Sequence, residues 1–193
     1  AVICAPVRSQ TAMGAIPTTP PIWHIIQRNF LPAIKLAPMT RSDTVVKMWG
    51  EFTPDDVFEM AVLRTEIFFL EQQIDEEELD AWDRHPDTVH MWRSDHQGMT
   101  AYLRLVHDES AAGAHQGIAW SVGRMVVRAD CRGQGLAKQL LEEALEISGE
   151  RDLYLHAQEY VMPLYASVGF EPVGDTFMEA GIAHRLMIRR TGA

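Results

Sequence analysis

The chain has 193 residues, of which 47% are hydrophobic, and a formal net charge of -10 at pH 7. This length suits one domain with a sizeable core. The acidic balance argues against a general nucleic-acid binder, because such proteins neutralise phosphates with Lys and Arg. Charges interrupt every long apolar run, so we expect a soluble protein without a membrane span. Cys4 and Cys131 lie far apart in unlike surroundings, which favours a reducing, cytoplasmic location over a disulfide framework or a cysteine metal site.

The first 43 residues differ in composition from the rest of the chain. Residues 1–42 hold six of the ten prolines and four basic residues but no acidic one. Proline at this density defeats regular structure. We therefore expect an irregular, basic N-terminal extension over residues 1–43 and one domain over 44–193. The extension reads equally well as upstream sequence, a tail or a targeting peptide, although it lacks a convincing amphipathic helix.

The domain is expected to begin with a strand and a long helix. Residues 44–49 are β-prone, and Thr53 and Pro54 can cap and open a helix that runs to about Leu70. Residues recurring at three- and four-residue spacing predict its buried face: Val57, Met60, Ala61, Arg64, Ile67 and Phe68. The acidic stretch 75–87 that follows predicts a loop or a short helix.

The remainder alternates strands with helices. Residues 89–93 and 99–106 predict a hairpin whose turn, 94–98, ends in Gly98. After a loop over 110–117, we expect strands at 118–127, 152–157, 170–173 and 183–188. One helix should run from Leu136 to Ile147 and stop at Gly149, and a second should pass Tyr160 and Tyr165 and end at Gly169. This order predicts a mixed α/β sheet.

A strand, a glycine loop and a helix are consecutive at Arg132-Gly133-Gln134-Gly135-Leu136-Ala137. Glycines let successive backbone N–H groups point into one concavity, and the helix dipole adds positive potential there. The loop therefore suits a phosphate, although an isolated Gly-x-Gly is as readily a tight turn without a ligand. It is neither a Walker loop nor a dinucleotide fingerprint, because it lacks their residues and spacing.

In this loop, Arg132, Gly135 and Ala137 match the Arg/Gln-x-x-Gly-x-Gly/Ala pattern that follows a hydrophobic triplet, here Met125-Val126-Val127. A second pattern, Asn-x-x-Ala-x-x-Phe-Tyr-x-x-x-Gly-Phe, has its counterpart in Gln158-x-x-Val161-x-x-Leu164-Tyr165-x-x-x-Gly169-Phe170. On these two motifs the chain resembles the GNAT superfamily of acyl-CoA-dependent N-acetyltransferases. The resemblance implies a GNAT-type α/β (α+β) fold, with a mixed, mostly antiparallel central sheet flanked by helices.

Further segments resemble the ElaA-like branch of that superfamily. They are Arg64-x-x-x-Phe68-x-x-Glu71-Gln72, Gly123-Arg124-Met125-Val126-Val127 and Gly181-Ile182-Ala183-His184, together with an acidic stretch that runs from Glu78 through Asp80, Asp83 and Asp87 to His90. The resemblance covers roughly residues 44–190.

The resemblance implies acetyl transfer from acetyl-CoA, as co-substrate, to an amine, without a metal. It implies that the loop 132–137 holds the pyrophosphate, that the backbone of Met125, Val126 and Val127 lies against pantetheine and the acetyl carbonyl, and that Gln158 orients CoA in place of the usual Asn. Tyr165 would be the general acid near the sulfur. Its alternative is a phenol packed on the helix with its hydroxyl at the surface.

The general base is less well defined. Many members of the superfamily carry a Glu on the strand before the triplet, where this chain has Ser121. Glu71, His156 and an ordered water are then the options, and we rank Glu71 first because it follows the buried face of the first helix. An exposed glutamate at a helix end is an equally good interpretation.

Three residues are assigned to the acceptor side of the site. Arg64 and Arg124 can form a charge network with Glu71 or with acidic neighbours, or Arg64 can lie solvated on the helix. His90 and His184 recur in family-like settings and are candidates to line the acceptor pocket, although isolated histidines are more often structural or exposed. No metal site is expected, because His85, His90 and His96 lack convergent ligands.

Two other functions stay open from the sequence. One is an enzyme like the acyl-homoserine-lactone synthases, which share the fold and an Arg-and-Phe pattern on the first helix. The other is an acyl-CoA-binding module without catalysis, which the missing strand Glu favours. The expected partners are acetyl-CoA and an amine, small molecule or peptide, with no nucleic acid and no membrane, and a homodimer stays open.

Overall fold

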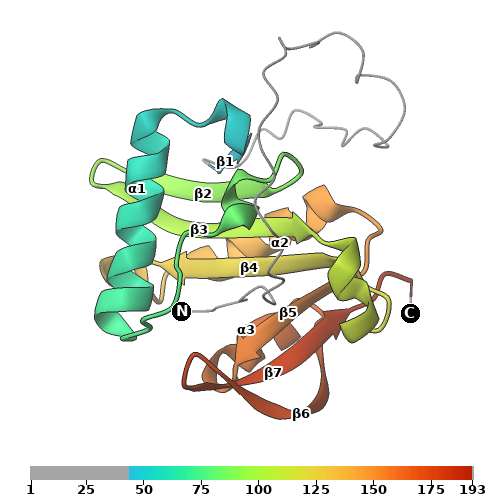
Figure 1. Ribbon diagram of the computed structural model, residues 1–193. Coiled ribbons are helices and arrows are strands. Elements are labelled where there is room, and N and C mark those ends of the chain that lie inside the picture. Colours follow the sequence, from blue (N-terminus) through green and yellow to red (C-terminus); the bar gives the residue numbers. More distant parts are fainter. Residues whose placement is uncertain (1–43, 193) are drawn as a thin grey trace, which may run out of the picture.

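The computed structural model describes residues 44–192, which form one sheet with helices on both faces (Figure 1). The extension expected over residues 1–43 lies outside the described residues. Seven strands in the order β1-β2-β3-β4-β5-β7-β6 make up the sheet. Neighbouring strands are antiparallel except β4 and β5. The strands are β1 Val45–Met48, β2 Val89–Asp95, β3 Gly98–His107, β4 Trp120–Val127, β5 Leu153–Gln158, β6 Glu171–Glu179 and β7 Ile182–Arg189.

The predicted mixed, mostly antiparallel sheet flanked by helices is confirmed. The hairpin between β2 and β3 is tighter than expected, since the strands extend to Asp95 and Gly98 and leave only two residues in the turn. Gly98 has a φ of 109°, which a residue with a side chain rarely adopts.

The first helix begins where its capping residues place it. Thr53 accepts a hydrogen bond from the Asp56 amide, and α1 spans Pro54–Arg64. It continues without a break as a π-helix, Thr65–Glu71. A π-helical turn of this length is rare and shifts the side chains that follow it to a different face. Of the predicted buried face, Val57 and Ala61 are only half-buried, whereas Leu63, which the spacing missed, is buried.

The other helices are α2, Leu136–Ser148, and α3, Met162–Ala166. Gly149 ends α2 with a φ of 62°. The second predicted helix is shorter than expected, because a 3-10 turn, Glu159–Val161, occupies its first part. Further 3-10 turns, Ala81–Arg84 and Glu109–Ala114, lie in the acidic stretch and in the loop before β4.

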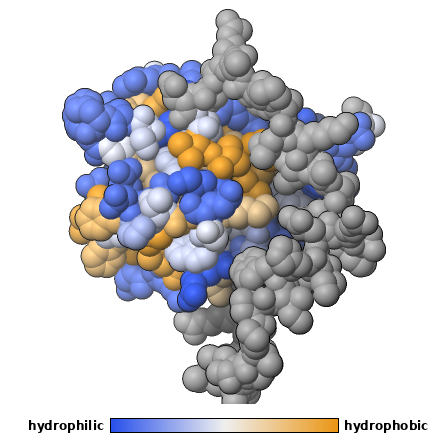
Figure 2. All heavy atoms as spheres, turned by 90° about the horizontal axis from the view of Figure 1, so that it is seen from above, coloured by the Kyte–Doolittle hydropathy of each residue, from blue (hydrophilic) through white to orange (hydrophobic). Residues whose placement is uncertain are grey.

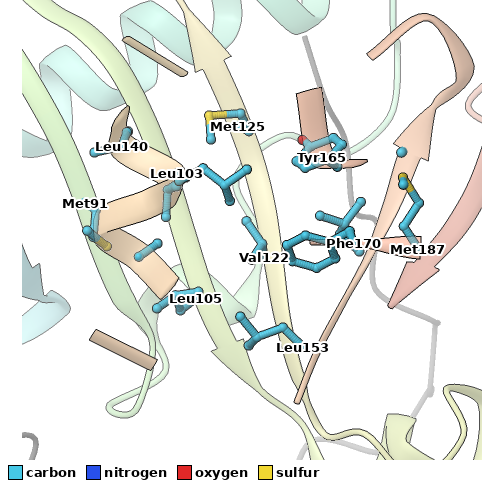
Figure 3. Packing of buried hydrophobic residues seen from close by; sticks show 14 of the residues in the cluster. Met91, Leu103, Leu105, Val122, Met125, Leu140, Leu153, Tyr165, Phe170 and Met187 are labelled. Carbon is cyan, nitrogen blue, oxygen red and sulfur yellow. The ribbon is translucent and has the colours of Figure 1, made fainter. Parts of the chain in front are cut away.

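Two cores lie on opposite faces of the sheet. The larger one packs α2 and α3 against the strands and includes Leu103, Val122, Leu140, Phe170 and Met187 (Figure 3). The second packs α1 and the π-helix on the other face, with Met60, Phe68, Trp92, Tyr102 and Val126. No helix within residues 44–192 is both long enough and apolar enough to cross a membrane. The face shown in Figure 2 mixes hydrophilic areas with smaller hydrophobic ones.

Candidate functional site

The sheet is interrupted at its centre, between β4 and β5. A single residue pair, Ser121 with Tyr154, joins these two strands within the described chain. Beyond it, residues 123–127 of β4 and 156–158 of β5 face a gap. A β-bulge contributes to the divergence, because Arg124 and Met125 together oppose one residue of β3, and Arg124 has a φ of 54°. The edge of β4 therefore presents backbone groups that no other strand among residues 44–192 binds.

The glycine loop lies at the end of β4. After a 3-10 turn, Ala129–Cys131, the chain passes Arg132 and enters α2. Gly133 and Gly135 have φ values of 74° and 79°, and Gly135 is the N-cap of the helix. A helix of 13 residues with no side-chain cap and no acidic residue in its first turn leaves amide N–H groups for an anion.

These elements surround a pocket of about 320 Å³. Eight of the ten residues expected to bind the cofactor line it: Met125, Val126, Val127, Arg132, Gly133, Gly135, Leu136 and Ala137. Cys131, Lys138, Val161 and Leu164 complete the lining, Val161 from the 3-10 turn before α3 and Leu164 from α3 itself. Of the other two expected residues, Gln134 donates its side-chain amide to the Asp130 carbonyl, and Gln158 ends β5.

Tyr165 follows Leu164 and is fully buried. Its ring packs edge-on against Phe170, with 6.0 Å between the centroids. Figure 3 shows both rings between β4 and the last strands, with the phenol oxygen of Tyr165 directed toward the side of β4 that carries Met125. A hydroxyl at the molecular surface, which was the alternative interpretation, is therefore wrong.

Glu71 binds the arginine of the glycine loop. Arg132 donates to both carboxylate oxygens of Glu71, at 2.9 and 2.6 Å, across 61 residues of sequence. This hydrogen bonding lowers the pKa of Glu71 and raises that of Arg132. A carboxylate with a lowered pKa is a weaker proton acceptor, so the geometry does not favour Glu71 as the base.

The acidic stretch and three arginines form a buried ion network under the π-helix. Arg64 pairs with Glu78 at 2.5 Å and Asp83 at 2.7 Å, Arg104 pairs with Asp80 and Asp83, and Arg124 pairs with Asp80 at 3.1 Å. All three arginines are at most 2% exposed. The expected network of Arg64 and Arg124 with acidic neighbours therefore exists, but Glu71 is not part of it. The hydrogen-bonding groups of Arg64 and His90 are already occupied by Glu78, Asp83 and Tyr102, so the expectation that they touch the acceptor directly does not fit their contacts.

His90 belongs to the same buried network. Its Nε2–H donates to the Asp83 carbonyl at 3.0 Å, and its Nδ1 accepts from the Tyr102 hydroxyl at 2.7 Å. Burial lowers the pKa of His90 to about 4, so it is neutral at pH 7. In Asp83, the nearby Arg104 and Arg64 outweigh burial and lower the pKa of the carboxyl. These contacts hold the acidic stretch against the sheet.

Gln158 and His184 lie opposite one another on β5 and β7. Both are fully buried, and within the described chain neither Oε1 of Gln158 nor Nε2 of His184 has a hydrogen-bond partner. His184 Nδ1 lies 2.9 Å from the Ile182 carbonyl, which can only accept, so Nε2 is the acceptor nitrogen. Buried polar atoms are normally satisfied. Two unsatisfied acceptors at the end of β5 therefore suit a donor supplied by a ligand.

A further group lies on the same face of β5. His156 contacts Glu179 of β6 at 2.8 Å and His115 at 3.3 Å. Sequence reasoning named His156 as one of three options for the base, but it missed His115 and Glu179. No local pattern marks those two residues, because they come from a loop and a hairpin that only the fold brings together.

Comparisons with known proteins agree with this geometry. Residues 70–190 match the acetyltransferase (GNAT) domain. An acyl-CoA N-acyltransferase from Pseudomonas aeruginosa superposes with a TM-score of 0.67 at 33% identity, over 76% of this chain and 97% of that one. The chain thus belongs to the GNAT acyltransferase family, whose fold it has.

Within that family the chain is a member of the ElaA-like group. A UPF0039 protein of Mycobacterium tuberculosis is 37% identical over 134 residues, which cover 69% of this chain and 83% of the relative. Escherichia coli ElaA superposes with a TM-score of 0.69 at 24% identity, over 76% of this chain and 98% of that one. A CoA-dependent acyl-homoserine lactone synthase, BjaI, shares the fold with a TM-score of 0.56 at 21% identity, over 71% and 78% of the two chains.

Proposed function

We propose that this protein transfers an acetyl group from acetyl-CoA to a primary amine, by direct attack of the amine on the thioester. The observation that carries the proposal is the pocket formed where β4 parts from β5 and where the glycine loop opens α2. The pocket combines an unpaired strand edge with a helix N-terminus, which suit an extended amide chain and a pyrophosphate respectively.

The proposed binding mode assigns each part of CoA to one element. Pantetheine would lie along Met125 to Val127 and hydrogen-bond to the strand edge. The pyrophosphate would lie at residues 133–137, where positive φ at Gly133 and Gly135 turns the backbone amides toward it. Arg132, at the same rim, adds a positive charge.

The interior of the gap favours a short acyl group. Val122, Tyr165 and Phe170 are buried side by side between the diverging strands (Figure 3). Because these large side chains occupy the core between the strands, a long acyl chain that entered there would have to displace them. This packing supports acetyl-CoA as the donor.

The chemistry divides between the two faces of the gap. Tyr165, from the cofactor side, would protonate the departing thiolate. Gln158 Oε1 and His184 Nε2, on the other face, would accept hydrogen bonds from the amine and orient it. Arg64 and His90 would act at a distance, by holding the acidic stretch that borders this face. The exposed carboxylates of Asp75, Glu76 and Glu77, before the ion-paired residues, would attract a cationic amine.

Incubation of the purified protein with acetyl-CoA and a panel of primary amines, small molecules and peptides, tests the proposal. We expect CoA release above background with at least one amine, and slower release with hexanoyl-CoA than with acetyl-CoA. Release of CoA only with S-adenosylmethionine present, accompanied by a lactone product, would assign the protein to lactone synthesis. CoA binding by calorimetry without transfer to any amine would leave a binding module, and neither binding nor transfer would reject the site itself.

A further inference from the structure

Three side chains from different parts of the chain form a line on the acceptor side of β5. Glu179 Oε2 lies 2.8 Å from His156 Nδ1, and His156 Nε2 lies 3.3 Å from His115 Nε2. His115 Nδ1 in turn lies 2.8 Å from the Ala111 carbonyl. The side chains of His156 and Glu179 are 17% and 12% exposed, so the line is largely shielded from water.

The proton positions follow from what each neighbour can do. The Ala111 carbonyl has no proton, so His115 Nδ1 must donate to it. The Glu179 carboxylate is likewise only an acceptor, so His156 Nδ1 must donate to that carboxylate. Each neutral imidazole has only one N–H proton, and in both rings that proton is then on Nδ1. The two Nε2 atoms would face one another with lone pairs alone, which is repulsive at 3.3 Å. One additional proton between them converts the repulsion into a hydrogen bond.

The pair is therefore built to take up a single proton. A carboxylate binds Nδ1 of His156 and only a neutral carbonyl binds Nδ1 of His115, so the additional proton is placed on His156 and is donated to His115. The negative charge of Glu179 compensates the imidazolium that forms. In this arrangement Glu179 and His115 both bind the charged form of His156, one at each ring nitrogen.

The position of the pair relates it to the site. Ser121 and Tyr154 form the one ladder pair of β4 with β5 in the described chain, and His156 is the second residue of β5 beyond it. Two residues further along the same face lies Gln158, which borders the gap with His184. His156 is thus at the closed end of the gap, on the face opposite the one that α2 and α3 cover.

Aromatic and charged side chains surround the His156–His115 pair. Tyr154 of β5 stacks on His115, with 3.7 Å between the ring centroids. Phe177 of β6 lies between His156 and His184 of β7. Asp108, before the loop that carries His115, adds a negative charge that favours protonation of His115. Among residues 44–192, the titratable groups near the pair are thus Tyr154, Asp108, His184 and Glu179.

We propose that the His156–His115 pair, with Glu179 behind it, is the general base that removes the proton from the acceptor amine. This inference rests on the proposed function. An N–H bond of the incoming ammonium breaks, its electron pair stays on nitrogen, and the proton forms a bond to His156 Nε2 and is shared with His115. The neutral amine then attacks the thioester carbon and forms the C–N bond, and the C–S bond breaks as Tyr165 protonates the thiolate. The second proton leaves the attacking nitrogen as the amide forms and restores the Tyr165 phenol.

Nitrogen-15 NMR of the imidazoles in the full, ligand-free chain tests the proton count without any turnover. We expect protonated Nδ1 atoms on both His115 and His156, and uptake of one proton by the pair, with both Nε2 signals shifting together. Two imidazoles that titrate separately, or an unprotonated Nδ1 on either ring, would overturn the inference even if acyl transfer occurs. Because this measurement needs no substrate, it fails independently of the proposed function.

Kinetics test the role in turnover. Replacement of His156 by Gln should lower kcat about 10²- to 10⁴-fold, the range of general base catalysis, and abolish the rise of kcat/KM with pH that accompanies deprotonation of the pair. CoA affinity should stay within about twofold, since the pair lies on the other face. Glu179→Gln should shift the same rise to lower pH. His96→Gln, at the exposed turn between β2 and β3, is the control and should behave as wild type.

Three kinetic outcomes would contradict the inference. One is a His156→Gln variant with unchanged kcat and pH profile. Another is a loss confined to KM, which would make His156 a binding residue. The third is activity that a chelator removes and Zn²⁺ restores, because the two Nε2 atoms would then be metal ligands.

Discussion

Replacing Glu71 by Gln tests whether Glu71 is the general base or only the partner of Arg132. In the structure Glu71 holds Arg132 at the rim of the pocket through two hydrogen bonds. Both side chains are more than 40% exposed, so solvent screens the pair and its net contribution is about 0 to 1 kcal/mol. The substitution therefore leaves stability almost unchanged, and it releases Arg132 for an anion.

The expected result is tighter binding of CoA. Removal of one negative charge beside the pyrophosphate site, worth at most about 1 kcal/mol, corresponds to a Kd about two- to fivefold lower. Calorimetric titration with CoA at 0.05 and 0.5 M salt measures it, and the gain should shrink at the higher salt because the charges are exposed. Glu66→Gln, which removes the same charge from the same π-helix, is the matched control.

Two results would refute this reasoning. A fall in kcat of about 10²-fold or more with unchanged CoA affinity would identify Glu71 as the general base. Weaker CoA binding would show that Glu71 orients Arg132 for the pyrophosphate and does not compete with it.

Three other predictions concern single positions. Tyr165→Phe should lower kcat about 10²-fold or more while the Kd for CoA stays unchanged, and an unaltered rate would remove the phenol from the mechanism. Gly135→Ala should lower the free energy of unfolding by about 1 to 2 kcal/mol, because the φ of Gly135 is 79°. Gly113→Ala is the control and should change it little, because the φ of Gly113 is not positive and no atom lies within 4 Å of the added Cβ. Equal denaturation midpoints for the two variants would contradict the argument. Between about pH 6.5 and pH 4, His90 binds a proton in the unfolded chain but not in the folded protein. The free energy of unfolding should therefore fall by about 3 kcal/mol as the pH drops through this window. Denaturant titrations at several pH values should show this slope in the wild type and lose it in His90→Asn, whereas equal slopes would mean that His90 is charged when folded.

Most of the fold could be predicted from local pattern. Alternating and helical periodicities located every strand and both long helices, although β6 continues to Glu179, well beyond the predicted residues 170–173. Thr53 and Gly149 fixed two helix ends to within a residue. The errors have local causes. The π-helix after Arg64 changes which side chains face the sheet, and a 3-10 turn replaces the start of the last predicted helix. Neither departure carries a distinctive sequence signal.

The site was predictable only where its residues are contiguous. The glycine loop and the triplet of β4 lie together along the chain, and the pocket includes them. The partner of Glu71 could not be read from the sequence, because Arg132 lies 61 residues away. The same holds for His156 with His115 and Glu179. The acidic stretch from Glu78 to His90 predicted a loop or a short helix, but not that burial would turn most of its carboxylates into internal ion pairs.

The single pair that joins β4 to β5 has a thermodynamic consequence. The two parts of the sheet on either side of it are held together by side-chain packing and not by a ladder of backbone hydrogen bonds. A molecule bound along the β4 edge would supply the missing bonds and act as an eighth strand. Its binding free energy would then add to the cohesion of the whole domain, about 2.7 kcal/mol at a ligand concentration 100 times its Kd. The resistance of this protein to proteolysis would accordingly follow the level of its own substrate.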